Sequence, residues 1–370
     1  MGARYGFYAK KPFLKSRFVN YFTQCALILI LKAWFIISLY CFIGYEIKKS
    51  FIFVPMRWKK ALVVGFKVAA ILGSTGFIAH RLWYEWNTGL LNQGIHNLNG
   101  SWAILLLVSF ILMFVNWGLE TLKWRLLLQP IQPISRKQSV KSVLSGITVS
   151  IFTPNRVGEF AGRVFVLSEN NRIQGVVATM IGNLTQLLVT LSVGLVFSPF
   201  FLQRFPNSIN INTHWVYLFS LLQLVLGFLV IIKWKAIIQM VRHWPILKKY
   251  PAFFKGFENY AKKDFFWILG LSLFRYLVFG MQFYLLLTLF NVSVTKSEAV
   301  LGITQFYFLM TLIPTFAMSE LGIRGSVAMV IFGLFTPITV GVLAASVVLW
   351  FMNLAIPALF GAIFLYQYKI

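Results

Sequence analysis

The sequence TPNRVGEFAGR at residues 153–163 is repeated in outline by IPTFAMSELGIRG at residues 313–325. Each copy contains a proline, then an acidic residue, and then an arginine four residues after the acid. Both copies interrupt long apolar stretches. Charged residues at membrane depth are costly, so they usually face a cavity or one another. A charged break that occurs twice in an apolar chain indicates a transport site at which the two breaks meet.

The first copy supplies three charged side chains, Arg156, Glu159 and Arg163. Residues four apart lie on the same face of a helix, so Glu159 and Arg163 can form an ion pair. The planar fork of an arginine also suits a phosphate group. We therefore predict that all three residues bind substrate, with a buried pair that only locks a kink as the alternative.

In the second copy, Glu320 and Arg324 have the same spacing, and we assign them the same two alternatives. We expect a helix break near each copy, because proline lacks the N–H that continues a helix and glycine lets another backbone approach. The residues assigned to these breaks are Pro154, Gly158, Gly162, Pro314 and Gly322. Two polar residues of later apolar stretches, Arg275 and Gln305, are candidates for lining a cavity.

The composition is typical of an all-α polytopic membrane protein. Of the 370 residues, 59% are hydrophobic and only 12% are charged, whereas a soluble domain has about 25% charged residues. Apolar runs repeatedly exceed the ~20 residues that span a bilayer. No hydrophilic stretch is long enough for a soluble catalytic domain, and no phosphate loop or metal-ligand spacing is present. We therefore expect no enzyme activity, no cofactor and no metal.

The net charge of +25 does not indicate nucleic acid, because the basic residues gather in loops between apolar segments. The loop 121–141 carries five Lys and Arg residues and the loop 233–263 carries eight. An excess of basic residues marks cytoplasmic loops and attracts anionic lipids. We predict that both loops lie on the cytoplasmic side of the inner membrane.

The charge of the loops predicts that two segments enter the membrane and return to the same side. One crossing, 174–202, separates the cytoplasmic loop 121–141 from the external loop 203–213. Residues 140–172 must then both enter from and return to the cytoplasm. By the same reasoning, residues 299–336 enter from outside and return there.

The predicted halves, 61–202 and 214–366, therefore have the same order of elements and opposite orientations. This is the plan of an inverted-repeat helical bundle with two broken or re-entrant helix pairs, which many transporters share. The alternative is that the two motifs arose by chance and that every apolar segment crosses the membrane.

The first 55 residues do not fit this plan. Their apolar segment has basic residues on both flanks, so its orientation is not specified. Met56 is followed by basic residues and then an apolar run, as at the start of a membrane protein. We expect residues 1–55 to be an atypical extension, or to lie upstream of the natural start, and residues 56–370 to form the transmembrane domain.

Three stretches together resemble a known family. WRLLLQ at 124–129, TPNRVGEFAGRVF at 153–165 and LGIRG at 321–325, preceded by the IP at 313–314, are similar to the transmembrane region of the lysylphosphatidylglycerol synthase and flippase family. The resemblance covers about 60–366. It implies translocation of a lipid or a lipid-linked headgroup.

The sequence departs from the family pattern in two ways. Fused members carry a soluble aminoacyl-transferase domain, for which this chain has no room, so we do not expect it to synthesise the lipid. The family's second motif often has paired glycines before its arginine and an acid after it, where this chain has Ser319, Glu320 and Gly325. The headgroup preference of the family is therefore not carried over.

The sequence predicts a stand-alone flippase or transporter of the cytoplasmic membrane. Its partners would be a phospholipid or lipid-linked substrate and anionic membrane lipids, with no nucleic acid. The alternative is an integral-membrane glycosyltransferase, or its accessory subunit, acting on polyprenyl-phosphate lipids with Glu159 as the acid.

Overall fold

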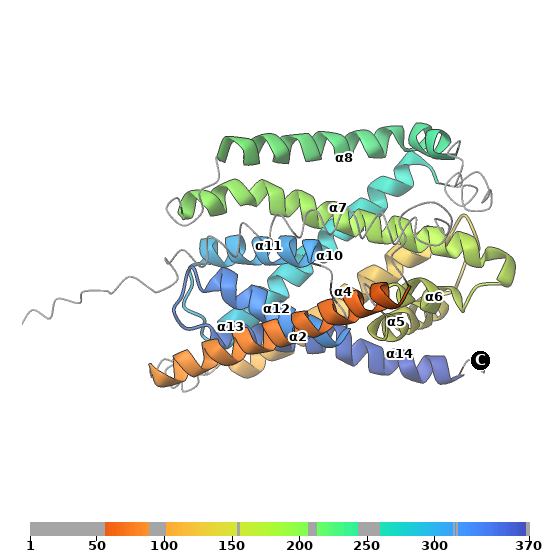
Figure 1. Ribbon diagram of the computed structural model, residues 1–370. Helices are drawn as coiled ribbons and strands as arrows, with labels where there is room; N and C mark the ends of the chain where they lie inside the picture. Colours follow the sequence, from red (N-terminus) through yellow and green to blue (C-terminus); the bar gives the residue numbers. More distant parts are fainter. Residues whose placement is uncertain are drawn as a thin grey trace, which may run out of the picture.

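The computed structural model describes the chain from residue 56 to residue 367 with short gaps, and every element in this part is helical. The described residues are 56–88, 101–153, 156–205, 213–242, 260–313, 315 and 317–367. The predicted extension 1–55 and the break residues Pro154 and Pro314 lie outside them. The long helices in Figure 1 are α2 (Met56–Asn87), α4 (Trp102–Leu128), α7 (Arg172–Arg204), α8 (Thr213–Arg242) and α10 (Lys262–Leu289).

Shorter helices make up the rest of the described bundle. They are α5 (Arg136–Ile151), α6 (Gly158–Val164), η3 (Glu169–Asn171), α11 (Lys296–Leu312), α12 (Ala317–Phe332), α13 (Val340–Trp350), the π-helix η4 (Phe351–Ala355) and α14 (Ile356–Gln367). Within the described residues, four helical stretches are long and apolar enough to cross a membrane: Trp102–Leu128, Glu169–Arg204, Lys262–Leu289 and Val340–Tyr366. The prediction of an all-α membrane protein is therefore confirmed.

Helices α4 and α10 pack antiparallel. Near the start of α4, the carbonyl of Ser109 accepts a hydrogen bond from Gln282 Nε2 at 2.9 Å. Two turns further along α4, Asn116 Oδ1 accepts one from Arg275 Nε at 2.8 Å. Gln282 and Arg275 are seven residues apart, so they lie on the face of α10 that contacts α4.

Helices α5 and α6 fold back on each other as an antiparallel hairpin. A Cβ atom on Gly162 would lie 2.6 Å from the Cα of Gly146, and one on Gly158 would lie 2.5 Å from the carbonyl oxygen of Val149. Gly158 is the first residue of α6, as expected for a break, but Gly162 lies inside this helix. The prediction of a break at Gly162 was wrong, because the glycine permits contact between two backbones rather than ending a helix.

Helices α11 and α12 form the second hairpin. Gly302 near the start of α11 meets the ring of Phe332 at the end of α12. Phe306, one turn further along, meets the guanidinium of Arg324, whose Cζ lies 5.9 Å from the ring centroid. Gly322 is inside α12, so the predicted break at this residue was wrong as well. A Cβ atom there would lie 2.6 Å from Ser74 Oγ of α2, so the glycine allows α2 to approach.

Each hairpin packs antiparallel on a helix of the other half of the chain. Thr148 Oγ1 of α5 donates to the carbonyl of Ala358 in α14 at 2.7 Å. On the other side, Gln305 of α11 donates to the carbonyl of Gly194 in α7 at 3.0 Å and accepts from Ser198 Oγ at 3.0 Å. The two halves of the chain therefore contact each other twice, through the packing of α5 on α14 and of α11 on α7.

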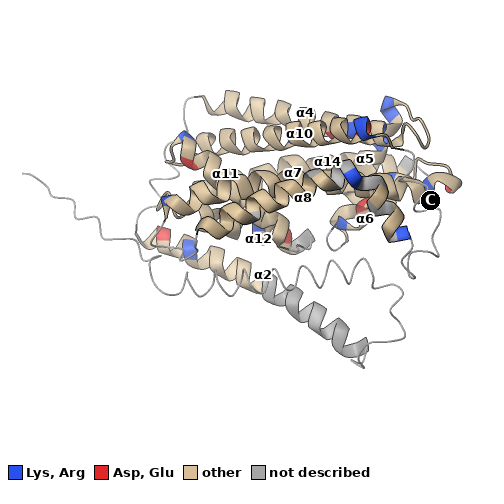
Figure 2. Ribbon diagram, turned by 90° about the horizontal axis from the view of Figure 1, so that it is seen from above, with Lys and Arg blue, Asp and Glu red and all other residues tan. Residues whose placement is uncertain are grey.

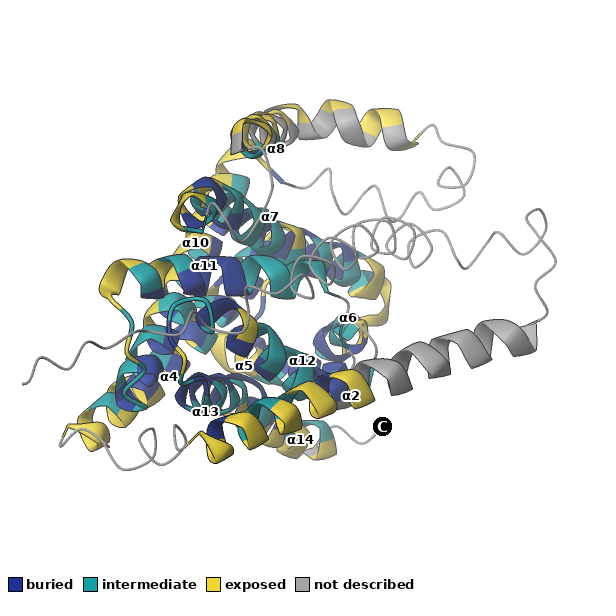
Figure 3. Cartoon of the chain, turned by 60° about the vertical axis from the view of Figure 1, so that its left-hand side comes forward, coloured by how far each residue is buried: buried dark blue, intermediate teal, exposed yellow. Residues whose placement is uncertain are grey.

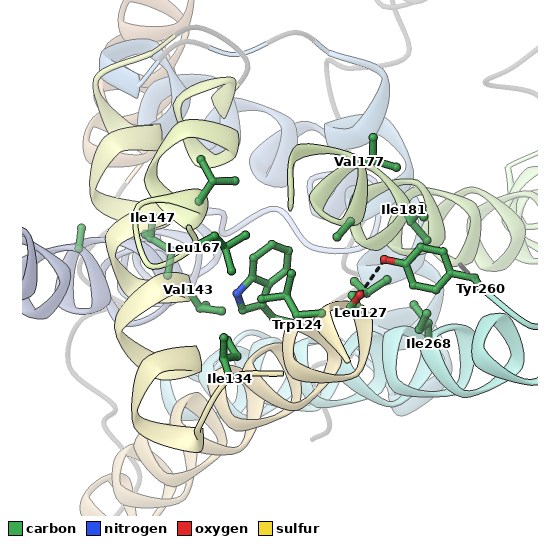
Figure 4. Packing of buried hydrophobic residues seen from close by; sticks show 14 of the residues in the cluster. Trp124, Leu127, Ile134, Val143, Ile147, Leu167, Val177, Ile181, Tyr260 and Ile268 are labelled. Carbon is green, nitrogen blue, oxygen red and sulfur yellow. Dashed lines mark hydrogen bonds between the residues drawn. The ribbon is translucent and has the colours of Figure 1, made fainter. Parts of the chain in front are cut away.

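An apolar cluster fixes the end of the bundle at which α4 finishes (Figure 4). The indole of Trp124 and the side chain of Leu127 are fully buried in it, between α5, α7 and α10. Tyr260 donates from its hydroxyl to the carbonyl of Leu127 at 2.7 Å, and burial raises the pKa of this phenol. The cluster ties the segment before α10 to the last turn of α4.

Helix α2 packs along α12 on the outside of the bundle, and many of its described residues from Leu72 onward are exposed (Figure 3). Its fully buried Glu85 accepts hydrogen bonds from the backbone N–H groups of Thr339 and Val340, at 2.8 and 3.1 Å. Arg81 Nε also contacts this carboxylate, at 3.2 Å. A carboxylate at the first N–H groups of a helix complements the helix dipole, so Glu85 caps α13 from another helix.

We expect Glu85→Ala to lower the free energy of unfolding by about 1–2 kcal/mol, because the first N–H groups of α13 lose their acceptor. Thermal unfolding of the purified protein in detergent measures the loss. Trp86→Ala on the same helix is the control, because this side chain is 67% exposed. An equal effect of the two substitutions would show that Glu85 does not cap α13.

Candidate functional site: a buried charged core

Glu120 of α4 lies at the centre of a buried ionic cluster. It is 1% exposed, and its two oxygens contact three cations. Oε1 lies 2.6 Å from Arg163 Nη2 of α6, and Oε2 lies 2.8 Å from Lys123 Nζ and 2.7 Å from Arg275 Nη1 of α10. Three cations around one buried carboxylate offset its loss of hydration.

Helix α6 places Arg163 against this cluster. Its backbone carbonyl accepts a hydrogen bond from Ser142 Oγ of α5 at 2.6 Å, which holds the two helices together. Its Nη2 contacts Glu159 in addition to Glu120, so the ion pair expected from the first motif is present. Its Nε and Nη1 are buried and have no hydrogen-bond partner among the described residues. Arg163 therefore has two buried N–H groups, on Nε and Nη1, that are available to a ligand.

A row of amides continues from Arg275 across three helices. Asn116 of α4 accepts from Arg275 Nε and donates to Asn353 Oδ1 at 3.0 Å. Asn353 donates in turn to Gln282 Oε1 of α10 at 2.7 Å. Asn353 lies in the π-helix η4, a local widening that often occurs at functional sites. This row fixes the orientation of Arg275.

Glu320 of α12 joins the two motif copies. Its Oε1 lies 2.6 Å from Arg156 Nη2 of the first copy and 3.0 Å from Arg324 Nη2 of the second. Arg156 has a positive φ of 56°, a conformation that a residue with a side chain rarely adopts. Its side chain is 43% exposed, whereas that of Glu320 is 5% exposed. The arginine with a strained backbone is therefore the most accessible charge of the group.

We call these eight residues the charged core. It contains five cations and three carboxylates: Lys123, Arg156, Arg163, Arg275, Arg324, Glu120, Glu159 and Glu320. The contacts divide it into two ionic clusters, one around Glu120 and one around Glu320, and with all groups ionised each cluster has one more cation than carboxylates. The ribbon positions of most other described Lys and Arg residues lie near the ends of helices (Figure 2). Arg156 is 43% exposed, so water solvates part of this excess, whereas the cluster around Glu120 keeps its extra cation in the interior. A buried positive excess is unfavourable unless an anion compensates it, which makes the charged core a candidate anion site.

The predicted site residues divide into two groups. Arg156, Glu159, Arg163, Glu320, Arg324 and Arg275 all belong to the charged core. Gln305 does not, because it is buried against α7.

Sequence reasoning missed the role of Glu120 and Lys123 in the site. Their spacing of three residues along a helix was the only available signal. The partners on α6 and α10 are 43 and 155 residues away from Glu120 in the chain.

Comparison with known protein families gives a match. The chain fits the model of the family described as "Lysylphosphatidylglycerol synthase TM region" over residues 62–362. This is the family that the three sequence motifs resemble, so that prediction is confirmed. The comparison with curated proteins found no match to this chain.

Proposed function

This chain belongs to the lysylphosphatidylglycerol synthase transmembrane-region family, and we propose that it moves an anionic phospholipid or lipid-linked headgroup across the cytoplasmic membrane. The observation that carries the proposal is the positive excess of the charged core. A phosphate matches it in sign, and a guanidinium fork binds phosphate through paired hydrogen bonds. Two buried donors of Arg163 and the Nε of Arg324 have no other partner among the described residues.

An inverted repeat would bring the two motifs to one site. In chain order, α2, α4, the α5–α6 hairpin and α7 correspond to α8, α10, the α11–α12 hairpin and the α13–α14 stretch. The correspondence is supported by the antiparallel packing of α4 on α10. It is also supported by two equivalent helix contacts: α5 packs on α14, and α11 packs on α7. Transporters with this plan bind substrate where the halves meet.

Contacts at the hairpin ends support two re-entrant segments. Gln132, just before α5, accepts hydrogen bonds from Ser168 and Asn171, just after α6. The first hairpin thus begins and ends at one end of the bundle. Gly341, at the start of α13, packs against the carbonyl of Phe290, just before α11. The second hairpin likewise begins and ends at a single end.

The two hairpins start from opposite ends of α7. Asn171 precedes this helix, while Arg204 at its end pairs with Glu298 of α11 at 3.2 Å. The 33 residues of α7 extend about 50 Å at 1.5 Å per residue. We infer that the first hairpin enters from the cytoplasm and the second from outside.

We assign the basic loops 121–141 and 233–263 to the cytoplasmic side. The hydrogen bond between Tyr260 and Leu127 supports placing both loops on the same side, because it joins a residue of each loop. An excess of basic residues on one side is the pattern expected for cytoplasmic loops.

The lipid phosphate would bind first to Arg156, the most exposed arginine of the charged core. Arg324 shares Glu320 with Arg156, so a phosphate that displaces this carboxylate gains two arginines at once. Glu320 and Glu159 would hold the arginines while no lipid is bound. Exchange of a carboxylate for a phosphate keeps both arginines paired with an anion. The acyl chains would remain in the bilayer.

The transport test uses proteoliposomes with a fluorescent phosphatidylglycerol and a quencher outside. We expect Arg156→Gln to slow the movement of label between leaflets about tenfold or more, because a hydrogen bond to a charged group contributes ~1.5–3 kcal/mol and 1.4 kcal/mol is tenfold. Arg172→Gln is the matched control, since in the described part of the chain this arginine pairs with Glu169 alone, and both side chains are exposed. Wild-type rates in both Arg156→Gln and Arg324→Gln would overturn the proposal.

The alternative of a glycosyltransferase acting on polyprenyl-phosphate lipids remains a separate prediction. Binding of a nucleotide sugar to the purified protein would indicate a glycosyltransferase, because a flippase does not need this substrate.

A further inference from the structure

A lateral groove runs along the outside of α4, separate from the contacts of the charged core. It encloses about 670 Å³ between α4, α5 and α14, within the size range of ligand pockets. Its walls are almost entirely apolar, with Phe114 and Leu122 of α4 facing Leu144 of α5 and Phe360 of α14. The rings of Phe114 and Phe360 are 59% and 53% exposed. In a membrane, such an open apolar channel meets lipid chains.

Two arginines lie at one end of the groove. Arg125 belongs to the last turn of α4 and Arg136 begins α5. Both are exposed, and neither makes a hydrogen bond or ion pair within the described ranges. Lys141 lies nearby, with its Nζ 5.6 Å from the ring centroid of Phe364. An apolar channel that ends in a cluster of cations matches an amphiphile with an acyl chain and an anionic head.

Trp117 separates this groove from the charged core. Its ring lines the groove, and the Cζ of Arg275 lies 5.3 Å from its centroid. Arg275 is in turn bound to Glu120 and Asn116. The indole Nε1 of Trp117 is buried and has no hydrogen-bond partner in the described part of the chain. One side chain of α4 thus contacts both the groove and the charged core.

We propose that the groove binds one acyl chain of an anionic phospholipid, whose phosphate is held by Arg125 and Arg136. The proposal rests on the proposed function, because it takes the bound lipid to be the one that is moved. Arginine is suited to this place, since its fork binds phosphate oxygens in pairs. The basic end of the groove belongs to the loop assigned to the cytoplasm, where anionic lipids give the membrane surface its negative potential.

Native mass spectrometry of the full chain, released from micelles that contain phosphatidylglycerol or phosphatidylcholine, tests the proposal. We expect the wild type to retain phosphatidylglycerol in preference to phosphatidylcholine. Gly118→Phe should fill the groove, because this glycine lines it and a Cβ atom there meets no atom within 4 Å. We expect this variant to retain about tenfold less phosphatidylglycerol, as should the double variant Arg125→Gln/Arg136→Gln, which loses the charge-assisted bonds.

Gly270→Phe is the control, because Gly270 of α10 is equally open and lies away from the groove. Equal retention of lipid by Gly118→Phe and Gly270→Phe would overturn the proposal. So would a wild-type dimer that Gly118→Phe converts to a monomer, because a second copy would then occupy the groove. If the groove variants lose lipid but the wild type transports none, the groove stands and the proposed function fails.

Discussion

Glu120→Gln is expected to lower the free energy of unfolding by about 3–5 kcal/mol, the usual cost of removing one partner from a buried ionic cluster. The substitution keeps the shape of the side chain and removes its charge. Lys123, Arg163 and Arg275 would then share a buried site with only Glu159 left to offset them. Unfolding by increasing denaturing detergent in mixed micelles, followed by tryptophan fluorescence, measures the loss.

Two further variants separate charge from packing at Glu120. Glu169→Gln removes a carboxylate from an exposed pair, at a distance of 3.5 Å from Arg172, and should change stability by less than about 1 kcal/mol. Adding Lys123→Met to Glu120→Gln removes one of the uncompensated cations and should restore part of the lost stability. If the double variant is less stable than Glu120→Gln alone, the excess of buried cations is not the cause.

Gly162→Val is expected to cost at least as much as the upper end of the ~1–3 kcal/mol that overpacking usually costs. A Cβ atom at this position would lie 2.6 Å from the Cα of Gly146 and 2.7 Å from the carbonyl oxygen of Ser145. Both are backbone atoms, so they cannot rotate away as the end of a side chain can. The α5–α6 hairpin must open, and Arg163 must move with it. Thermal unfolding and the transport assay should both report this change.

The control for Gly162→Val is a helical glycine in open surroundings. A Cβ atom on Gly270 of α10 meets nothing within 4 Å. Gly270→Ala should therefore raise stability slightly, by up to about 1 kcal/mol, because alanine favours the helix. A wild-type melting temperature for Gly162→Val would show that the two hairpin backbones are not in contact.

Local spacing predicted part of the charged core from the sequence. The four-residue separation of Glu159 from Arg163, and of Glu320 from Arg324, is a property of any helix, and both pairs are present. The link from Arg156 to Glu320 spans 164 residues, and no local rule indicates it. Long-range packing of the hairpins, which depends on many weak contacts, decides such pairs.

The helix boundaries, too, could be predicted from the sequence only where local hydropathy decides them. The predicted returning segment 299–336 includes α12, which covers Ala317–Phe332. Its first turn contains Ser319 and Glu320, which are polar yet buried, so the start of the helix could not be recognised. The π-helix between α13 and α14 was likewise not predicted from the sequence.

Because the charged core has more cations than carboxylates, the membrane voltage does work on it whenever it moves across the membrane. An elementary charge that crosses 100 mV does work of about 2.3 kcal/mol. The five cations and three carboxylates carry a net charge of two, and a lipid phosphate would reduce it to one. An inside-negative voltage would thus hold the empty core toward the cytoplasm more strongly than the loaded one.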